Sequence, residues 1–148
     1  GVLRQGRVEQ AATADELYAA PANPFVAGFV GRASTFAGEV VETSRDQSRV
    51  RVEGAIWTVL RPVHLPMGSK ALVLARPEAL AIVEPAASLV CGVVTERRFA
   101  GAMAFFSVRT DRGTPVEVSA GGHEAAVGRR VGLVPRDRGI HLFPAESR

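Results

Sequence analysis

Apolar and polar residues follow two different patterns along this chain of 148 residues. From Phe36 onward, the apolar residues form short runs rich in Val, Ile and Phe, which Gly or Pro interrupts every few positions. Regularly spaced short runs with turn signals are typical of a small β-barrel or sandwich. We therefore predict two sets of five strands, at residues 36–43, 48–53, 55–60, 71–75 and 80–83, and at residues 89–96, 103–109, 115–119, 131–135 and 140–143.

The first residues of the chain carry the signals of a hairpin and a short helix. The hairpin is predicted over residues 2–8, with its turn at Gln5-Gly6. Thr13 then has the residue type of a helix N-cap, and Glu16 stands three positions later, which is the capping-box spacing. Because proline cannot continue a helix, we expect this helix to stop at Pro21.

A second short helix is predicted directly after the first. Asn23 is a typical N-cap residue and Pro24 suits the first helical position. Gly31 is the predicted C-terminal stop. The apolar residues between these signals share one helical face: Phe25, Val26, Phe29 and Val30.

The two sets of strands resemble copies of one unit. Gly68 precedes Arg76 by the same distance as Gly128 precedes Arg136, so the copies align at an offset of 60 residues. At the N-terminal ends of the two copies the offset is 54 residues. One such unit is small for a stable core, so we expect the pair to bury a shared face. The predicted parts of the chain are residues 1–34, 35–86 and 87–148.

Composition excludes several classes of protein. Apolar residues make up 47% and charged residues 22%, with a net charge of +3, as in ordinary soluble domains. No apolar run approaches the ~20 residues that span a bilayer, and the polar start of the chain lacks the pattern of a signal peptide. Basic residues are scattered, so we expect no nucleic-acid partner. An oligonucleotide-binding barrel remains an alternative, because aromatic residues stand near Arg97, Arg98 and Arg109: Phe99, Phe105 and Phe106.

The other chemically distinctive side chains are predicted to be structural. Cys91 lies in an apolar run and should be a small buried hydrophobe, and Trp57 should be a core or interface residue. His141 alternates with apolar neighbours, so it should face solvent on the final strand, whereas His64 and His123 should lie in loops. The three histidines are dispersed and lack metal-ligand spacing, so we predict no metal site.

Residues 6–31, GRVEQAATADELYAAPANPFVAGFVG, resemble the end of the nucleotide-binding domain in the ATPase subunits of ABC importers. The family pattern runs approximately G-[KR]-[IV]-x-Q-x-G-[TS]-P-x-E-[LI]-Y-x-x-P-x-[NST]-x-F-V-A-x-F-[IVL]-G. Ala12 and Ala14 depart from its usual Gly and Pro, and neither change disturbs the predicted cap. The resemblance implies that residues 1–34 are the remnant of a larger ATP-binding domain.

Residues 68–83 resemble the first copy of the regulatory TOBE region of the same family, through Arg76-Pro77-Glu78 after an apolar strand. Pro135-Arg136-Asp137 is a looser second match. The resemblance implies a mostly β fold of two tandem, small, OB-like barrels of five strands each, of the TOBE or MOP type. It is closest to importers of polyamines, iron, sugars and phosphonates, and it does not separate these substrates.

The ATP-hydrolysing motifs of that family are missing from the sequence. There is no G-x-x-x-x-G-K-[ST] phosphate loop: Lys70 follows Gly68-Ser69 but is followed by Ala71. No apolar strand ends in the Asp-Glu pair that would hold Mg²⁺, and no LSGGQ-like signature occurs. We therefore expect a fragment that is not catalytic and holds no cofactor, with ATP and Mg²⁺ bound elsewhere in the parent protein.

The resemblance implies a regulatory and dimerising module. Its expected partners are a second copy of itself, as a homodimer, and transmembrane permease subunits reached through the parent ATPase domain. The expected location is the cytoplasmic side of the membrane.

A ligand-binding module is the alternative, because related barrels bind small oxyanions or other effectors. The candidate residues are Arg32, Ser34, Thr35, Arg76 and Arg136, which offer hydroxyl and guanidinium donors. A purely structural role remains open for each of them. The two hydroxyl residues would then cap or join elements, Arg76 would pair with Glu78, and Arg136 with Asp137.

Overall fold

The computed structural model describes residues 1–60 and 65–145. A hairpin and two helices come first: β1 (Val2–Arg4), β2 (Arg7–Gln10), α1 (Ala14–Ala19) and α2 (Pro24–Val30). Ten strands follow, in two five-stranded sheets. This confirms the predicted mostly β fold, and no helix of the described residues is long and apolar enough to cross a bilayer.

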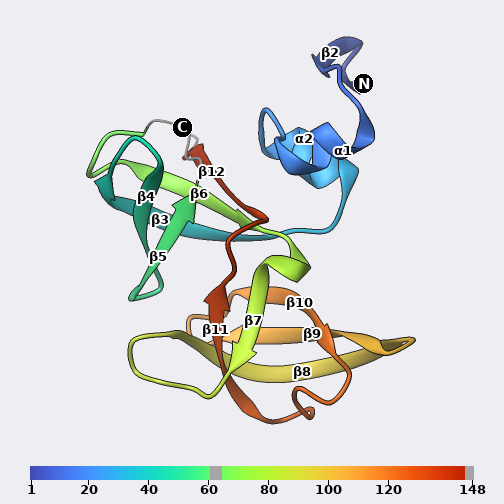
Figure 1. The fold of residues 1–148 in the computed structure, drawn as a ribbon, viewed down its shortest axis with the longest axis vertical. Helices are drawn as coiled ribbons and strands as arrows, with labels where there is room; N and C mark the ends of the chain where they lie inside the picture. Colours follow the sequence, from blue (N-terminus) through green and yellow to red (C-terminus); the bar gives the residue numbers. More distant parts are fainter. Residues whose placement is uncertain (61–64, 146–148) are drawn as a thin grey trace.

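The first sheet has the order β12-β6-β3-β4-β5, and the second has the order β10-β9-β8-β11-β7 (Figure 1). In both sheets all neighbouring strands are antiparallel. Each sheet curls until its two edge strands approach, β12 against β5 and β10 against β7, which produces two partly open barrels. The first sheet consists of β3 (Ser34–Thr43), β4 (Gln47–Val52), β5 (Ala55–Leu60), β6 (Lys70–Ala75) and β12 (Ile140–Pro144). The second consists of β7 (Leu80–Val83), β8 (Val90–Ala100), β9 (Met103–Thr110), β10 (Pro115–Gly121) and β11 (Arg130–Pro135).

The last strand of each predicted half pairs with the other half. β7 joins the second sheet and β12 joins the first, and Figure 1 shows the two strands passing in opposite directions between the sheets. The connections that precede them are hydrogen-bonded to each other: Arg76 N donates to Gly139 O at 2.9 Å, and Arg136 N donates to Ala79 O at 2.6 Å. The division of the chain at residue 86 stays a prediction, but the sheets do not follow it.

A single apolar core joins the two barrels, as the repeat predicted. It contains Trp57 and Phe36 from the first sheet, whose rings meet edge to face at 5.1 Å, together with Phe106 and Leu133 from the second. Burial alternates along the strands that line it, for example along β4 and β5. Trp57 is 2% exposed and Cys91 is also buried, which confirms both predictions.

The helix caps form as predicted. The Thr13 hydroxyl accepts the backbone N–H of Glu16 at 3.2 Å, and the Asn23 side chain accepts that of Val26 at 3.0 Å. Gly31 ends α2 in extended backbone, with φ of 173°, so it does not adopt the left-handed turn that favours glycine. Glycine is needed here for space, because a Cβ would lie 2.9 Å from a ring carbon of Tyr18.

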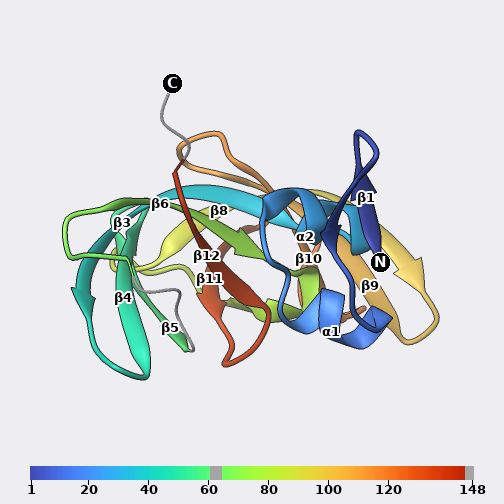
Figure 2. The same cartoon turned by 90° about the horizontal axis from the view of Figure 1, so that it is seen from above.

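The N-terminal segment, defined as residues 1–33, lies against the first sheet. Ala27 of α2 packs on Leu74 of β6 and Phe143 of β12. Val26, on another face of the same helix, packs instead on the start of the chain. The hairpin β1–β2 projects from the molecule beyond the helices (Figures 1 and 2). This docked position places residues 31–34, which run from the end of α2 to the first residue of β3, beside both barrels.

Candidate functional site around residues 31–34

Residues 31–34 are held from two sides by arginine contacts. On one side, Arg76 of the connection after β6 donates to the backbone of this stretch. On the other side, the Arg32 side chain reaches Glu117 of β10 in the second sheet. The short stretch between α2 and β3 therefore joins the N-terminal segment to both barrels.

The Arg76 cluster consists of Arg76, Tyr18 and the carbonyl groups at the end of α2. Arg76 is 0% exposed, and its Nη1 donates to Ala27 O at 2.8 Å and to the carbonyls of Gly31 and Arg32, both at 3.2 Å. Carbonyls at a helix C-terminus carry partial negative charge and lack partners within the helix, so a cation suits this position. The guanidinium carbon also lies 4.3 Å from the centroid of the Tyr18 ring, at cation–π distance.

Burial changes the acid–base properties of this cluster. It lowers the pKa of Arg76, because the charged guanidinium loses its hydration. Two of the guanidinium nitrogens, Nε and Nη2, are buried without a hydrogen-bond partner among the described residues. Burial, together with the hydrogen bond that Tyr18 donates to Glu78, raises the pKa of the Tyr18 phenol to about 12. Glu78 thus pairs with Tyr18, and the hydrogen bonds of Arg76 go to carbonyl groups.

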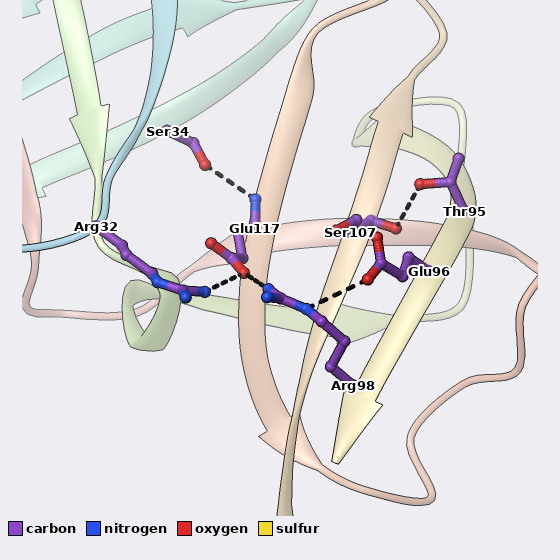
Figure 3. A network of polar contacts seen from close by, with 7 residues as sticks. All are labelled: Arg32, Ser34, Thr95, Glu96, Arg98, Ser107 and Glu117. Atoms are coloured by element: carbon purple, nitrogen blue, oxygen red, sulfur yellow. Dashed lines mark hydrogen bonds and ion pairs between the residues drawn. The ribbon is translucent and has the colours of Figure 1, made fainter. Parts of the chain in front are cut away.

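The Glu117 cluster consists of Arg32, Arg98, Phe105 and Glu117, on the outer face of the second sheet, and Figure 3 shows its three charged members. Strand register explains its geometry. Phe105 lies opposite Arg98 across β8 and β9, and Glu117 of β10 lies opposite Ser107, two positions further along β9. Because every second residue of a strand points outward, all of these side chains share one face.

Both arginines of the cluster bind the same oxygen of Glu117. Arg32 Nη1 donates to Glu117 Oε1 at 2.7 Å, and Arg98 Nη2 also donates to this atom. The Arg32 and Arg98 guanidinium carbons lie 5.1 Å and 5.8 Å from the Phe105 ring centroid. The Glu117 backbone N–H donates to Ser34 Oγ at 2.9 Å, which fastens the start of β3 to β10.

An open groove of about 580 Å³ is lined by four of these residues, Arg32, Ser34, Arg98 and Glu117. Its charged side chains comprise three arginines and two glutamates, so the groove has an excess of one positive charge: Arg32, Arg98, Arg109, Glu96 and Glu117. Hydroxyl groups of Ser34, Thr95 and Ser107 also line it. Guanidinium groups and hydroxyls are donors that hold small anions through charge-assisted hydrogen bonds.

The structure brings together two of the five residues predicted as a ligand site. Arg32 and Ser34 line the groove, whereas Thr35 is exposed on β3 opposite Leu74. Arg76 is buried beneath the end of α2. Arg136 is exposed and lines a separate groove of about 400 Å³ with Glu78, and none of the ion pairs among the described residues joins it to Asp137.

Sequence reasoning did not select Arg98 and Glu117 as candidates for an anion site. Glu117 stands in the predicted strand 115–119, as many other charged residues stand in predicted strands, and Arg98 lies two residues beyond the end of the predicted strand 89–96. The aromatic residues of the oligonucleotide hypothesis also separate: Phe106 is in the core, whereas Phe99 is 63% exposed and stacks on Arg97 at 4.9 Å. The structure therefore does not arrange the three rings as one surface.

The histidines form no metal site among the described residues. His64 lies outside those residues, and His123 is exposed in a turn, as predicted. The prediction for His141 was wrong in part. The His141 side chain lies on the strand face opposite to Ile140 and Leu142, as predicted, but it is half-buried, and its Nε2 has no hydrogen-bond partner among the described residues. Burial, and the nearby charge of Arg76, lower the pKa of His141.

The chain resembles known proteins in sequence and in fold. Residues 73–143 match the family described as the TOBE domain. The chain is 38% identical over 124 residues to the spermidine/putrescine import ATP-binding protein PotA of Escherichia coli (strain K12), and equally to that of Shigella boydii serotype 4 (strain Sb227). Each alignment covers 80% of this chain and 32% of the relative.

A solved structure of the cytoplasmic molybdate-binding protein ModG, with molybdate bound, has a TM-score of 0.61 to this chain at 13% sequence identity. The match covers 78% of this chain and 97% of ModG, and at this identity it shows a shared fold. The protein is therefore a TOBE-domain protein built from paired OB-like barrels. The chain corresponds to the C-terminal, TOBE-containing region of the ATP-binding subunits of ABC importers, and it spans about a third of the length of the curated relatives it matches.

Proposed function

We propose that this chain is a regulatory module of an ABC importer subunit, in which the barrels control the position of the N-terminal segment. The observation that carries the proposal is the Arg76 cluster. A buried arginine of the barrel region binds the carbonyl of Ala27 in α2 and those of Gly31 and Arg32 directly after it, at the end of the segment that resembles the end of an ATP-binding domain. A change in the barrels would reach the ATPase through this contact.

The whole subunit would drive import of a small solute by ATP hydrolysis, together with permease subunits at the inner face of the membrane. The names of the curated relatives favour a polyamine as the solute. ATP and Mg²⁺ would bind to parts of the subunit outside this chain, since its sequence lacks a phosphate loop. The chain alone should accordingly show no ATP hydrolysis.

The regulatory role can be tested in the whole subunit assembled with its permease. The variant Arg76→Met keeps an apolar side chain of similar length and removes the donor to α2. We expect a changed rate of ATP hydrolysis at unchanged ATP affinity. Arg49→Gln is the matched control, because it removes an exposed arginine whose partner is Glu42 in the same barrel. Equal rates in wild type and both variants would exclude this route of regulation.

We also propose that two copies of the chain associate as a homodimer. Light scattering after size-exclusion chromatography tests this directly. A monomer at the highest accessible concentration would remove dimerisation from the proposal and leave the contact with α2 unaffected.

Binding of a small oxyanion is a second candidate function. The groove at Arg32, Ser34 and Arg98 favours it through its donors and its excess positive charge. The fold neighbour ModG is a molybdate-binding protein, which is consistent with this chemistry. Titration calorimetry against molybdate, tungstate, sulfate and phosphate is the test, and the absence of heat with all four, in the wild type and in a Glu117→Gln variant that removes the carboxylate between the two arginines, would exclude the candidate.

A further inference from the structure

The space between Arg32 and Arg98 already holds an anionic group, the chain's own Glu117 carboxylate. Two guanidinium groups converge on a single carboxylate oxygen (Figure 3), and both also lie at cation–π distance from Phe105. The backbone of Glu117 is fixed separately, through its N–H bond to Ser34 Oγ. The carboxylate can therefore leave the two arginines while β10 stays in place.

Exposure makes such a displacement feasible. The Arg32 and Arg98 side chains are 55% and 44% exposed, and the Glu117 side chain is 23% exposed. Ion pairs this close to water are weakened by solvation and by salt, so a competing anion in solution faces a small barrier. A deeply buried pair would resist exchange, because separation would leave uncompensated charges in the interior.

The charges of the groove favour a doubly charged competitor. Its three arginines face two glutamates while Glu117 is in place. When the Glu117 carboxylate turns outward, the remaining charges are those of the three arginines and Glu96, an excess of two positive charges. Coulomb attraction scales with the product of the charges, so a dianion is attracted about twice as strongly as a carboxylate at the same distance.

We propose that Glu117 is a built-in competitor at this anion site, and that a doubly charged tetrahedral oxyanion takes the place of its carboxylate between Arg32 and Arg98. The inference rests on the second candidate function above. It adds that, in the absence of a ligand, the Glu117 carboxylate occupies the site. Glu117 therefore sets the ligand concentration to which the site responds. Because Arg32 also offers its carbonyl to Arg76, the exchange takes place at a residue that belongs to the contact that holds α2.

The variant Glu117→Gln tests this inference in the full 148-residue chain. It keeps the size of the side chain and removes the competing charge. Calorimetry with molybdate and with sulfate, at constant ionic strength, should show about fivefold tighter binding than wild type, which is within the range expected for losing two exposed ion pairs, with Arg32 and with Arg98. Arg98→Gln should weaken binding at least about tenfold, because it removes a charged donor.

Glu42→Gln is the matched control. It removes one carboxylate that pairs with an exposed arginine, Arg49, so it changes the net charge equally but in the other barrel. Its affinity should stay within about twofold of wild type, since the remaining effect is long-range and screened. Fluorescence of the buried Trp57 verifies that each variant is folded.

The outcomes separate this inference from the candidate function on which it rests. Tighter binding by Glu117→Gln than by Glu42→Gln supports the competitor, and so does binding that appears only in Glu117→Gln. Equal binding by wild type, Glu117→Gln and Glu42→Gln overturns the role of Glu117 as a competitor, while the anion site stands. Binding by none of these proteins overturns both. The amide resonance of Glu117 gives a second readout, because its N–H bond to Ser34 should persist when the carboxylate leaves.

Discussion

Replacement of Arg76 by methionine should release the N-terminal segment from the barrels without unfolding them. The substitution keeps an unbranched apolar side chain in a buried position and removes every hydrogen bond to the end of α2. The apolar core that joins the two sheets does not include Arg76. The effect should therefore be confined to α1 and α2 and to residues 31–34.

The magnitude follows from the contacts of the Arg76 cluster. All three carbonyl groups are bound by Nη1, which carries two hydrogens, so the contact amounts to two strong hydrogen bonds. Bonds to a charged group contribute about 1.5–3 kcal/mol each, and a desolvated cation–π contact with Tyr18 contributes about 2 kcal/mol. The buried, unpaired Nε and Nη2 oppose these terms. We expect a net loss of about 2–3 kcal/mol in the free energy that holds the segment.

Hydrogen exchange of the α2 amides measures this free energy directly. A loss of 2–3 kcal/mol corresponds to exchange that is about 30- to 150-fold faster. Urea unfolding followed by Trp57 fluorescence should change by less than about 0.5 kcal/mol, because Trp57 reports on the core. Arg76→Lys should have an intermediate effect, since an ammonium group keeps the charge but loses the planar stacking on Tyr18. Unchanged α2 exchange in Arg76→Met would refute the reasoning, and so would an equal loss at Trp57.

Three further predictions concern single side chains. Tyr18 is the only tyrosine, so the phenolate absorbance should titrate near pH 12 in the folded chain and near the ordinary value of about 10 in concentrated urea. Because the folded pKa is the higher one, the stability from this group is complete below about pH 10 and is lost as the pH rises through about 12; a midpoint near 10 in both states would contradict this. Gly92→Ala should lower the free energy of unfolding by about 1–3 kcal/mol or more, since a Cβ there would lie 2.3 Å from Arg109 O, and an unchanged urea midpoint would show that the strands separate easily. Ser34→Ala should cost about 1–2 kcal/mol in urea unfolding, because it removes the acceptor of the Glu117 N–H, and a loss below about 0.3 kcal/mol would mean that water replaces the hydroxyl.

Local signals in the sequence predicted the secondary structure closely. Short apolar runs bounded by Gly and Pro located all ten barrel strands, with ends that differ from the observed ones by a few residues, the largest difference being at the end of β8. Residue types at Thr13 and Asn23 predicted the two helix starts, because a cap depends on a side chain and a backbone group three residues apart. His141 shows the limit of such reasoning, since its strand face was predicted correctly and its burial depends on distant residues.

The site was only partly accessible from the sequence. Arg32 and Ser34 were selected for their donors, and the structure places both in the groove. Their partner Glu117 lies 85 positions from Arg32, on a strand of the other barrel. No local pattern marks such a pair, because each residue alone resembles an ordinary exposed charge on a strand.

The sequence by itself determined the composition of this protein's fold: a hairpin, two capped helices, and ten short strands in two similar sets. Only the tertiary structure decided that β7 and β12 exchange sheets. The two strands are equivalent positions of the repeat, with Leu80 aligned to Ile140, so both have the same pattern and either pairing satisfies it. The choice depends on long-range packing: the connections after Arg76 and Arg136 hydrogen-bond to each other, and this crossing carries both strands into the opposite sheets.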